Sequence, residues 1–228
     1  MRTHPRQWLP SWPALWLGLA GLVLQASAAA ADQPTQVRVT TNMGDFVIET
    51  LPDRAPITVQ NYLRYVREGF YTGTLFHRVV ANFVIQGGGH AAADFKLKPA
   101  HDPIFNESGN GLQNKRGMVG LARGESAHSG NAQFYVNLVD NPDLDPLPTR
   151  WGYAVFGKVV QGMDVVDRIG VTPTGAMGPF KADAPLKPVI IEKIEIMDAA
   201  AGQPGAPVKP APPAPVAPTS PDGILSPK

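Results

Sequence analysis

The sequence contains no cysteine among its 228 residues. Disulfides are therefore excluded, and the fold must be held by packing alone. A chain of this length has enough residues for one domain with a sizeable core and little room for a second domain. An oxidising compartment would neither cross-link nor damage such a protein.

Long hydrophobic runs are also absent. The apolar stretch ALWLGLAGLVL at positions 14–24 has eleven residues, whereas a membrane-spanning helix needs about 20. It follows two arginines within the first six residues and precedes a series of small residues, which is the order of a secretory signal peptide. We expect residues 1–31 to be a signal peptide that is cleaved near residues 28–32. A membrane anchor is the alternative, and a lipoprotein anchor is excluded because no cysteine follows the run.

The chain has no marked excess of charge of either sign. It carries 20 Lys and Arg against 19 Asp and Glu, and removal of Arg2 and Arg6 with the signal peptide would leave 18 against 19. Nucleic-acid-binding proteins usually carry a basic patch, and the sequence shows no such cluster. We therefore expect no nucleic-acid partner, and membrane contact only through an uncleaved signal peptide. An export signal on a disulfide-free domain favours a periplasmic location.

Aromatic residues are missing from the C-terminal segment. Residues 201–228 contain nine of the 24 prolines together with alanine and serine. Such a composition buries too little apolar surface to offset the cost of ordering. We expect residues 200–228 to be a disordered tail, with a polyproline recognition ligand as the alternative. The working domain is then expected at residues 34–199.

Motifs for metal or nucleophilic chemistry are lacking as well. The histidines of the expected domain, at positions 77, 90, 101 and 128, show none of the close spacings of metal ligands. The glycines at 87–89 lack the Lys-Ser/Thr of a phosphate-binding loop. Residues 124–128 resemble a hydrolase nucleophile elbow without its final glycine, so we interpret them as a polar loop. We expect no metal and no cofactor.

What the sequence does contain is a series of short apolar strands. Residues 42–45 have turn chemistry between two of them, and a stripe of Val59, Tyr62, Leu63 and Val66 indicates a helix. Helices are expected at 53–69 and 163–169. Strands are expected at 36–41, 46–51, 74–80, 83–86, 117–122, 133–138, 155–160 and 189–197. Many short strands with two helices predict a mainly β fold, a closed antiparallel eight-stranded barrel capped by two α-helices.

One stretch is far more specific than the others. Residues 76–88 contain FHR, a short spacer, a phenylalanine and QGG in that order, and the stretch resembles the central motif of cyclophilins. Residues 116–123, 132–136 and 153–159 resemble the next conserved blocks of that family, in family order. The resemblance covers nearly all of residues 34–197, and it is to the bacterial periplasmic subgroup. It implies a cyclophilin-like barrel and a peptidyl-prolyl cis-trans isomerase.

The resemblance also implies which residues form the site. Arg78, Phe83 and Gln86 would be catalytic, with Arg78 donating a hydrogen bond to the prolyl nitrogen. The substrate-binding residues would be Val84, Ala122, Arg123, Gln133, Tyr135, Leu144 and Tyr153. Asp143 departs from the family pattern because many cyclophilins have an aromatic residue before the leucine of the rim, and Tyr153 stands where many have histidine.

The implied partners are proline-containing peptides and unfolded exported proteins, whose folding the enzyme would accelerate. Two alternatives belong to other classes of protein. The first is a non-catalytic peptide-binding module or periplasmic chaperone that uses the same groove, although holding apolar peptides does not require Arg78. The second is an adaptor whose proline-rich tail is the main functional element.

Overall fold

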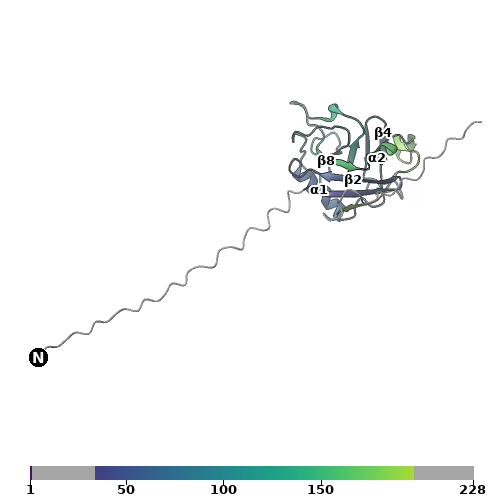
Figure 1. Cartoon of the computed structure of the whole chain (residues 1–228). Coiled ribbons are helices and arrows are strands. Elements are labelled where there is room, and N and C mark those ends of the chain that lie inside the picture. Colours follow the sequence, from purple (N-terminus) through teal and green to yellow (C-terminus); the bar gives the residue numbers. More distant parts are fainter. Residues whose placement is uncertain (2–33, 198–228) are drawn as a thin grey trace, which may run out of the picture. The chain divides into compact units, whose positions relative to one another are not determined.

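The computed structural model describes Met1 and residues 34–197 (Figure 1). The expected signal peptide and the proline-rich tail lie outside the described residues, and the same holds for the cleavage site. Residues 34–197 form strands and helices in close agreement with the predicted order of elements. Neither helix in this part of the chain is both long and apolar enough to cross a membrane.

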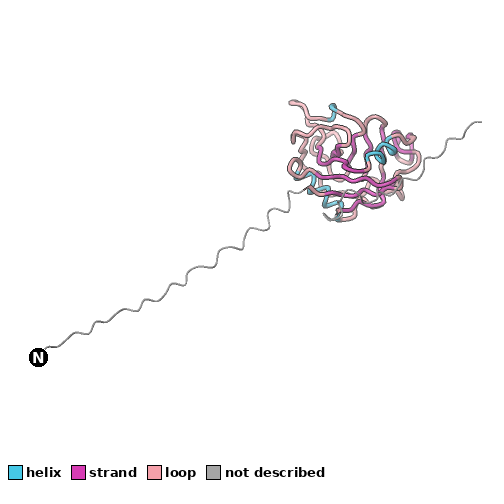
Figure 2. Tube along the Cα trace, viewed as in Figure 1, coloured by secondary structure: helices cyan, strands magenta, loops and turns pink. Residues whose placement is uncertain are grey.

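The domain is built on one large antiparallel sheet, whose strands are magenta in Figure 2. Its strands are β1 (Gln36–Thr41), β2 (Gly44–Thr50), β3 (Thr74–Leu75), β4 (Arg78–Val80), β5 (Val84–Gly87), β6 (Met118–Leu121), β7 (Phe134–Asn137), β8 (Val155–Gln161) and β11 (Ile190–Ile196). Their order in space is β3-β11-β1-β2-β8-β6-β7-β5-β4. The hairpin predicted at the N-terminal end of the domain is confirmed, since β1 pairs with β2 from Gln36 opposite Glu49 to Thr41 opposite Gly44.

The closed eight-stranded barrel expected from the sequence is wrong. The segment predicted as one strand at 74–80 is two short strands, and β3 and β4 lie at opposite ends of the sheet. The break falls at Phe76 and His77, where the Phe76 N–H donates to the Val189 carbonyl (2.9 Å) and both side chains are buried. No pairing joins β3 to β4 within residues 34–197. The sheet is therefore a curled half-barrel of nine strands.

Two α-helices accompany the sheet. α1 (Pro56–Arg67) buries the predicted stripe of Val59, Tyr62, Leu63 and Val66, and α2 (Met163–Gly170) confirms the second predicted helix. The start of α1 has no side-chain cap of its own. Instead the Glu107 carboxylate accepts hydrogen bonds from the N–H groups of Ile57 (3.1 Å) and Thr58 (2.7 Å). An anion is favoured there because the first N–H groups of a helix have no partner within the helix.

A second, two-stranded sheet was not predicted. β9 (Thr174–Met177) and β10 (Phe180–Pro185) form a hairpin whose β10 lies close to β4 of the main sheet. The Phe180 ring stacks on His77 (centroids 5.5 Å apart) and meets the edge of Phe95. The hairpin is thereby fixed beside the FHR segment.

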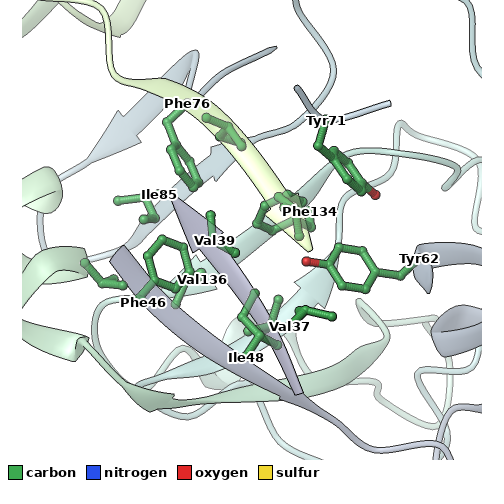
Figure 3. Close-up of a cluster of buried hydrophobic side chains, with 14 of the residues drawn as sticks. Val37, Val39, Phe46, Ile48, Tyr62, Tyr71, Phe76, Ile85, Phe134 and Val136 are labelled. Atoms are coloured by element: carbon green, nitrogen blue, oxygen red, sulfur yellow. The ribbon is translucent and has the colours of Figure 1, made fainter. Parts of the chain in front are cut away.

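The core contains the aromatic and aliphatic side chains of the inner sheet face and α1 (Figure 3). Phe134 meets three other rings, those of Tyr62, Tyr71 and Phe76, at centroid distances of 5.7, 5.6 and 5.9 Å. All three pairs are edge-to-face, which is a favoured geometry for aromatic rings. The Tyr71 hydroxyl donates to the Ala132 carbonyl (2.9 Å), so this buried phenol keeps a partner.

Candidate active site

Strand register places Arg78, Gln86 and Tyr135 side by side. Arg78 lies opposite Gln86 in the β4–β5 pair, and Gln86 lies opposite Tyr135 in the β5–β7 pair. Tyr135 in turn lies opposite Gly120 on β6. Directly opposed residues of antiparallel strands project from the same face of a sheet. We call these four residues the outer row.

The next row of the sheet identifies which face the outer row occupies. Val79, Ile85, Val136 and Val119 are opposed in the same way and are all buried in the core cluster. Side chains alternate between the two faces along a strand. The outer row therefore lies on the face directed away from the core. In the tripeptide Phe76-His77-Arg78, the first two side chains are buried and Arg78 lies on this outer face.

Arg78 has two neighbours besides Gln86. Its Nε lies 3.7 Å from the Asp183 Oδ2 on β10, and its Cζ lies 5.8 Å from the centre of the Phe83 ring. A tight turn brings Phe83 back toward Arg78, since the Phe83 N–H donates to the Val80 carbonyl (3.0 Å) and Asn82 adopts a left-handed backbone (φ 58°). Asparagine is one of the few side chains that tolerate this conformation. The Arg78 side chain is 39% exposed, so its guanidinium can be reached from solvent.

Two glutamines border Arg78 on the side of β7. The Gln86 Nε2 donates to the Gln133 Oε1 (3.2 Å), and the Ala122 N–H donates to the Gln133 carbonyl (2.9 Å). A surface cleft of about 270 Å³ begins at Gln133 and includes Phe70 and Lys98 in its lining. Gln133 therefore borders a cleft in which an extended peptide has room to lie, and Gln86 is hydrogen-bonded to Gln133.

Tyr135 forms the buried part of the outer row. Its side chain is 3% exposed, and its hydroxyl donates to the Asn114 Oδ1 (2.5 Å). Burial raises the pKa of the Tyr135 phenol well above its ordinary value, so the group is neutral at physiological pH. Glycine is required opposite it, because a Cβ at Gly120 would lie 2.2 Å from the Tyr135 ring. Asn114 is held by its own Nδ2, which donates to the Asp145 carboxylate (2.9 Å).

The far side of the site is formed by Tyr153, Leu144 and Arg123. The Tyr153 N–H donates to the Leu144 carbonyl (2.9 Å), and the Tyr153 ring meets the edge of Tyr135 at 6.1 Å. The Arg123 guanidinium lies 4.5 Å from the centre of the Tyr153 ring. Its Nε and Nη2 donate to the carbonyls of Gly152 (3.2 Å) and Trp151 (3.0 Å). Arg123 is therefore occupied in holding this loop.

The ten predicted site residues form one connected set. Contacts described above link nine of them, and Val84 follows Phe83 in the chain, with its 2% exposed side chain opposite Val80. Sequence reasoning missed Asp183 and Asn114, which position Arg78 and Tyr135. The Gly178-Pro179 pair between two short runs could have signalled the β9–β10 hairpin that carries Asp183. No pattern in the sequence connects Asn114 to Tyr135.

Metal-ligating side chains do not converge here. Within the described part of the chain, no three histidine or acidic side chains lie close enough together to hold a metal ion.

Comparisons with known proteins agree with this geometry. Residues 36–196 match the family described as cyclophilin type peptidyl-prolyl cis-trans isomerase/CLD. Peptidyl-prolyl cis-trans isomerase B of Escherichia coli is 48% identical over 161 residues, which cover 69% of this chain and 97% of that protein. Peptidyl-prolyl cis-trans isomerase A of Dickeya dadantii is 42% identical over 170 residues, covering 75% of this chain and 88% of that one.

The fold also recurs in a solved structure. The crystal structure of a Cryptosporidium parvum cyclophilin type peptidyl-prolyl cis-trans isomerase, in the presence of the dipeptide Ala-Pro, superimposes with a TM-score of 0.59 at 24% identity. The match covers 72% of this chain and 99% of that chain. Since the family match spans nearly all of residues 34–197 and these two relatives are more than 40% identical over the aligned residues, the chain belongs to the cyclophilin-type peptidyl-prolyl cis-trans isomerases.

Proposed function

We propose that this chain rotates X-Pro peptide bonds of exported proteins, in the periplasm, with Arg78 as the catalytic group. The observation that carries the proposal is the position of Arg78 in the outer row, where it lies opposite Gln86 and its partly exposed guanidinium lies 5.8 Å from the centre of the Phe83 ring. The apolar ring and the amide are the two kinds of surface that a proline and its neighbouring peptide group require. Family membership supports the reaction itself.

The reaction needs a donor aimed at the prolyl nitrogen. The C–N bond resists rotation because nitrogen shares its lone pair with the carbonyl, and the barrier is about 18–20 kcal/mol. A hydrogen bond to the nitrogen localises that lone pair and weakens the partial double bond. Arg78 suits this role because a guanidinium stays charged and presents its donors in a fixed plane.

One hydrogen bond is too weak to account for an efficient isomerase. A charge-assisted hydrogen bond contributes about 1.5–3 kcal/mol, whereas an acceleration of about 10⁵-fold needs about 7 kcal/mol. Only interactions that are stronger in the twisted state than in the planar state contribute. The remainder must come from a preorganised surface. Phe83, Val84, Tyr135 and Leu144 are proposed to hold the proline ring, and Gln86 and Gln133 the adjacent peptide groups.

Export is supported by the N-terminal sequence. The charged start, the eleven-residue apolar run and the small residues up to Ala31 have the order of a secretory signal. A disulfide-free domain suits a compartment in which thiols are oxidised, because it has none to oxidise. The clients in that compartment would be unfolded exported chains with slow X-Pro bonds.

The test has two parts. The purified domain is assayed for cis-trans isomerisation of an Ala-Pro tetrapeptide in a protease-coupled assay, and we expect a rate well above the uncatalysed one. Cells that express the full chain are separated into periplasmic and cytoplasmic fractions, and we expect the shortened protein in the periplasm. Peptide binding without turnover would favour the non-catalytic module. A full-length cytoplasmic protein would refute export.

Asp183 is expected to orient Arg78 during turnover. Asp183→Asn keeps a side chain that tolerates the left-handed backbone at this position (φ 60°) but removes the charge that faces the Arg78 Nε. An exposed ion pair contributes about 0–1 kcal/mol, so kcat/KM on the tetrapeptide should fall by about twofold to fivefold, mainly in kcat. Lys181→Gln, on the same hairpin, is the control and should leave kcat unchanged. In an Arg78→Lys background, Asp183→Asn should lower kcat/KM by a smaller factor. An equal fall in both backgrounds would show that Asp183 does not act through Arg78.

The proline-rich tail is expected to be dispensable for catalysis. A stop codon after Ala200 removes nine prolines and leaves all the residues of the outer row intact. Melting temperature and kcat/KM on the tetrapeptide should stay within experimental error of the full chain. Calorimetry and the coupled assay measure the two quantities. A fall of several degrees, or a clear loss of turnover, would show that the tail stabilises or assists the domain.

A further inference from the structure

Three aromatic rings lie together on the surface near the proposed substrate groove, which we define by the predicted substrate-binding residues together with Arg78, Phe83 and Gln86. Phe105 stacks on His128 with ring centres 4.6 Å apart and planes 17° apart. Trp151 meets the edges of both, at 5.6 Å from Phe105 and 5.1 Å from His128. We call these three residues the aromatic triad. Phe105 is 54% exposed and Trp151 43%, and His128 is exposed as well.

Asn106 ties together the backbone segments that carry the triad. This buried side chain donates through Nδ2 to the carbonyls of Ala127 (2.9 Å) and Gly152 (3.0 Å). Its backbone N–H donates to the His128 Nδ1 (3.1 Å). The three segments that carry the rings are therefore tied to one residue. A preorganised surface of this kind loses little conformational entropy when a ligand covers it.

The triad adjoins Tyr153 and Arg123, two residues of the proposed substrate groove. Trp151 and Tyr153 flank Gly152, and the Arg123 guanidinium donates to the Trp151 and Gly152 carbonyls while lying over the Tyr153 ring. A peptide that passes Tyr153 and Arg123 thus meets the triad next. A cluster of exposed aromatic side chains beside a groove is typical of a binding site. Without a binding role, such a cluster would only lower the solubility of the protein.

The size of the surface indicates the kind of partner. An aromatic side chain buries about 150–250 Å² in full, so three half-exposed rings offer a few hundred Å² at most. A stable contact between folded proteins, including two copies of this chain, buries about 800 Å² on each partner. The triad is too small for that. It is large enough for one or two apolar side chains of an extended chain.

We propose that the aromatic triad is a secondary docking site for apolar or aromatic side chains of an unfolded polypeptide whose X-Pro bond occupies the groove. The inference rests on the proposed function and adds a second point of attachment to it. Attachment at two linked points raises the effective concentration of the X-Pro bond at Arg78. The triad therefore lowers KM for long clients and leaves kcat and the turnover of short peptides unchanged.

The test uses Phe105→Ser combined with Trp151→Ser, which removes two rings and keeps Asn106 and the Trp151 backbone carbonyl. The matched control is Val171→Ser with Leu186→Ser, because both side chains are exposed and apolar (78% and 54%) and lie after α2 and after β10. Three probes are compared. They are the Ala-Pro tetrapeptide, a twelve-residue peptide with one Ala-Pro bond and flanking leucine and phenylalanine, and the same peptide with serine at the flanking positions.

We expect the triad variant to turn over the tetrapeptide and the serine peptide within about twofold of wild type. Its KM for the leucine-phenylalanine peptide should rise about fivefold to tenfold at unchanged kcat, and the control variant should match wild type on all three probes. Equal KM values for the two long peptides in the wild-type enzyme would overturn the docking site, as would an equal KM rise in the control variant. A wild-type dimer that the triad variant dissociates, seen by sedimentation, would assign the surface to self-association instead. Absence of tetrapeptide turnover in the wild type would refute the proposed function. The docking site would then be decided by the Kd values of the two long peptides: weaker binding of only the leucine-phenylalanine peptide to the triad variant would support it, and equal Kd values in the wild type and the variant would overturn it.

Discussion

Arg78→Ala should lower kcat/KM on an Ala-Pro tetrapeptide by between about tenfold and 150-fold. This range corresponds to the loss of one charge-assisted hydrogen bond of about 1.5–3 kcal/mol in the twisted state. The fold should survive, because the Arg78 side chain is 39% exposed and its ion pair with Asp183 is also exposed. We expect the melting temperature to change by no more than about 2 °C, since surface substitutions usually cost less than about 0.5 kcal/mol. The coupled assay and calorimetry measure the two effects.

Arg78→Lys is the informative companion variant. Lysine keeps the positive charge but lacks the planar fork of donors, so it should recover only part of the lost turnover. Arg54→Ala is a control for removing an exposed arginine, because Arg54 donates to the Asn110 carbonyl and lies outside the outer row. Turnover of Arg78→Ala close to that of the wild type would remove Arg78 from the mechanism. If Arg78→Ala also loses the folded state, the catalytic role of Arg78 is tested by the turnover of Arg78→Lys instead.

The domain should lose about 3 kcal/mol of stability through His77 as the pH falls from 6.5 to 4. Burial, with a smaller contribution from the neighbouring His90, lowers the pKa of His77 from 6.5 to about 4 in the folded state. The unfolded chain therefore binds a proton at this residue at a higher pH than the folded chain does. Stability from the neutral imidazole is complete above pH 6.5 and falls as the pH drops, and the loss levels off below pH 4.

Urea unfolding of wild type and His77→Phe at several pH values isolates this effect. Phenylalanine preserves a ring against His90 (4.5 Å) and Phe180 (5.5 Å) but cannot take up a proton. Carboxylates titrate in both proteins, so the quantity of interest is the difference between their free energies of unfolding. That difference should shift by about 3 kcal/mol in favour of the variant between pH 7 and pH 4. A difference independent of pH would show that His77 becomes protonated in the folded state without cost.

His77 and Arg78 are neighbours in the chain, and β4 begins between them. His77 is buried against Phe180, and Arg78 begins β4 with its side chain on the outer face. The pH dependence of stability therefore reports on His77 and the turnover reports on Arg78, so two independent measurements test the same short segment.

The sequence by itself determined the features that repeat over a few residues. The β1–β2 hairpin, α2 and the apolar stripe of α1 follow from periodicity and turn chemistry, and the structure confirms them. The candidate site residues followed from motifs in family order. Strand alternation has a period of two, and register then brings Arg78, Gln86 and Tyr135 into one row.

Only the tertiary structure decided how the sheet ends and what supports the site. The apolar segment 74–80 has the pattern of one strand, but β3 pairs with β11 and β4 with β5. The two halves of the segment therefore form opposite edges of the curled sheet, because the chain turns at Phe76, whose side chain is buried in the core. Arg78 meets Asp183 across 105 positions of the chain, and Asn106 joins segments 21 and 46 positions away. Such contacts carry no local period, since they depend on how the packed elements finally meet.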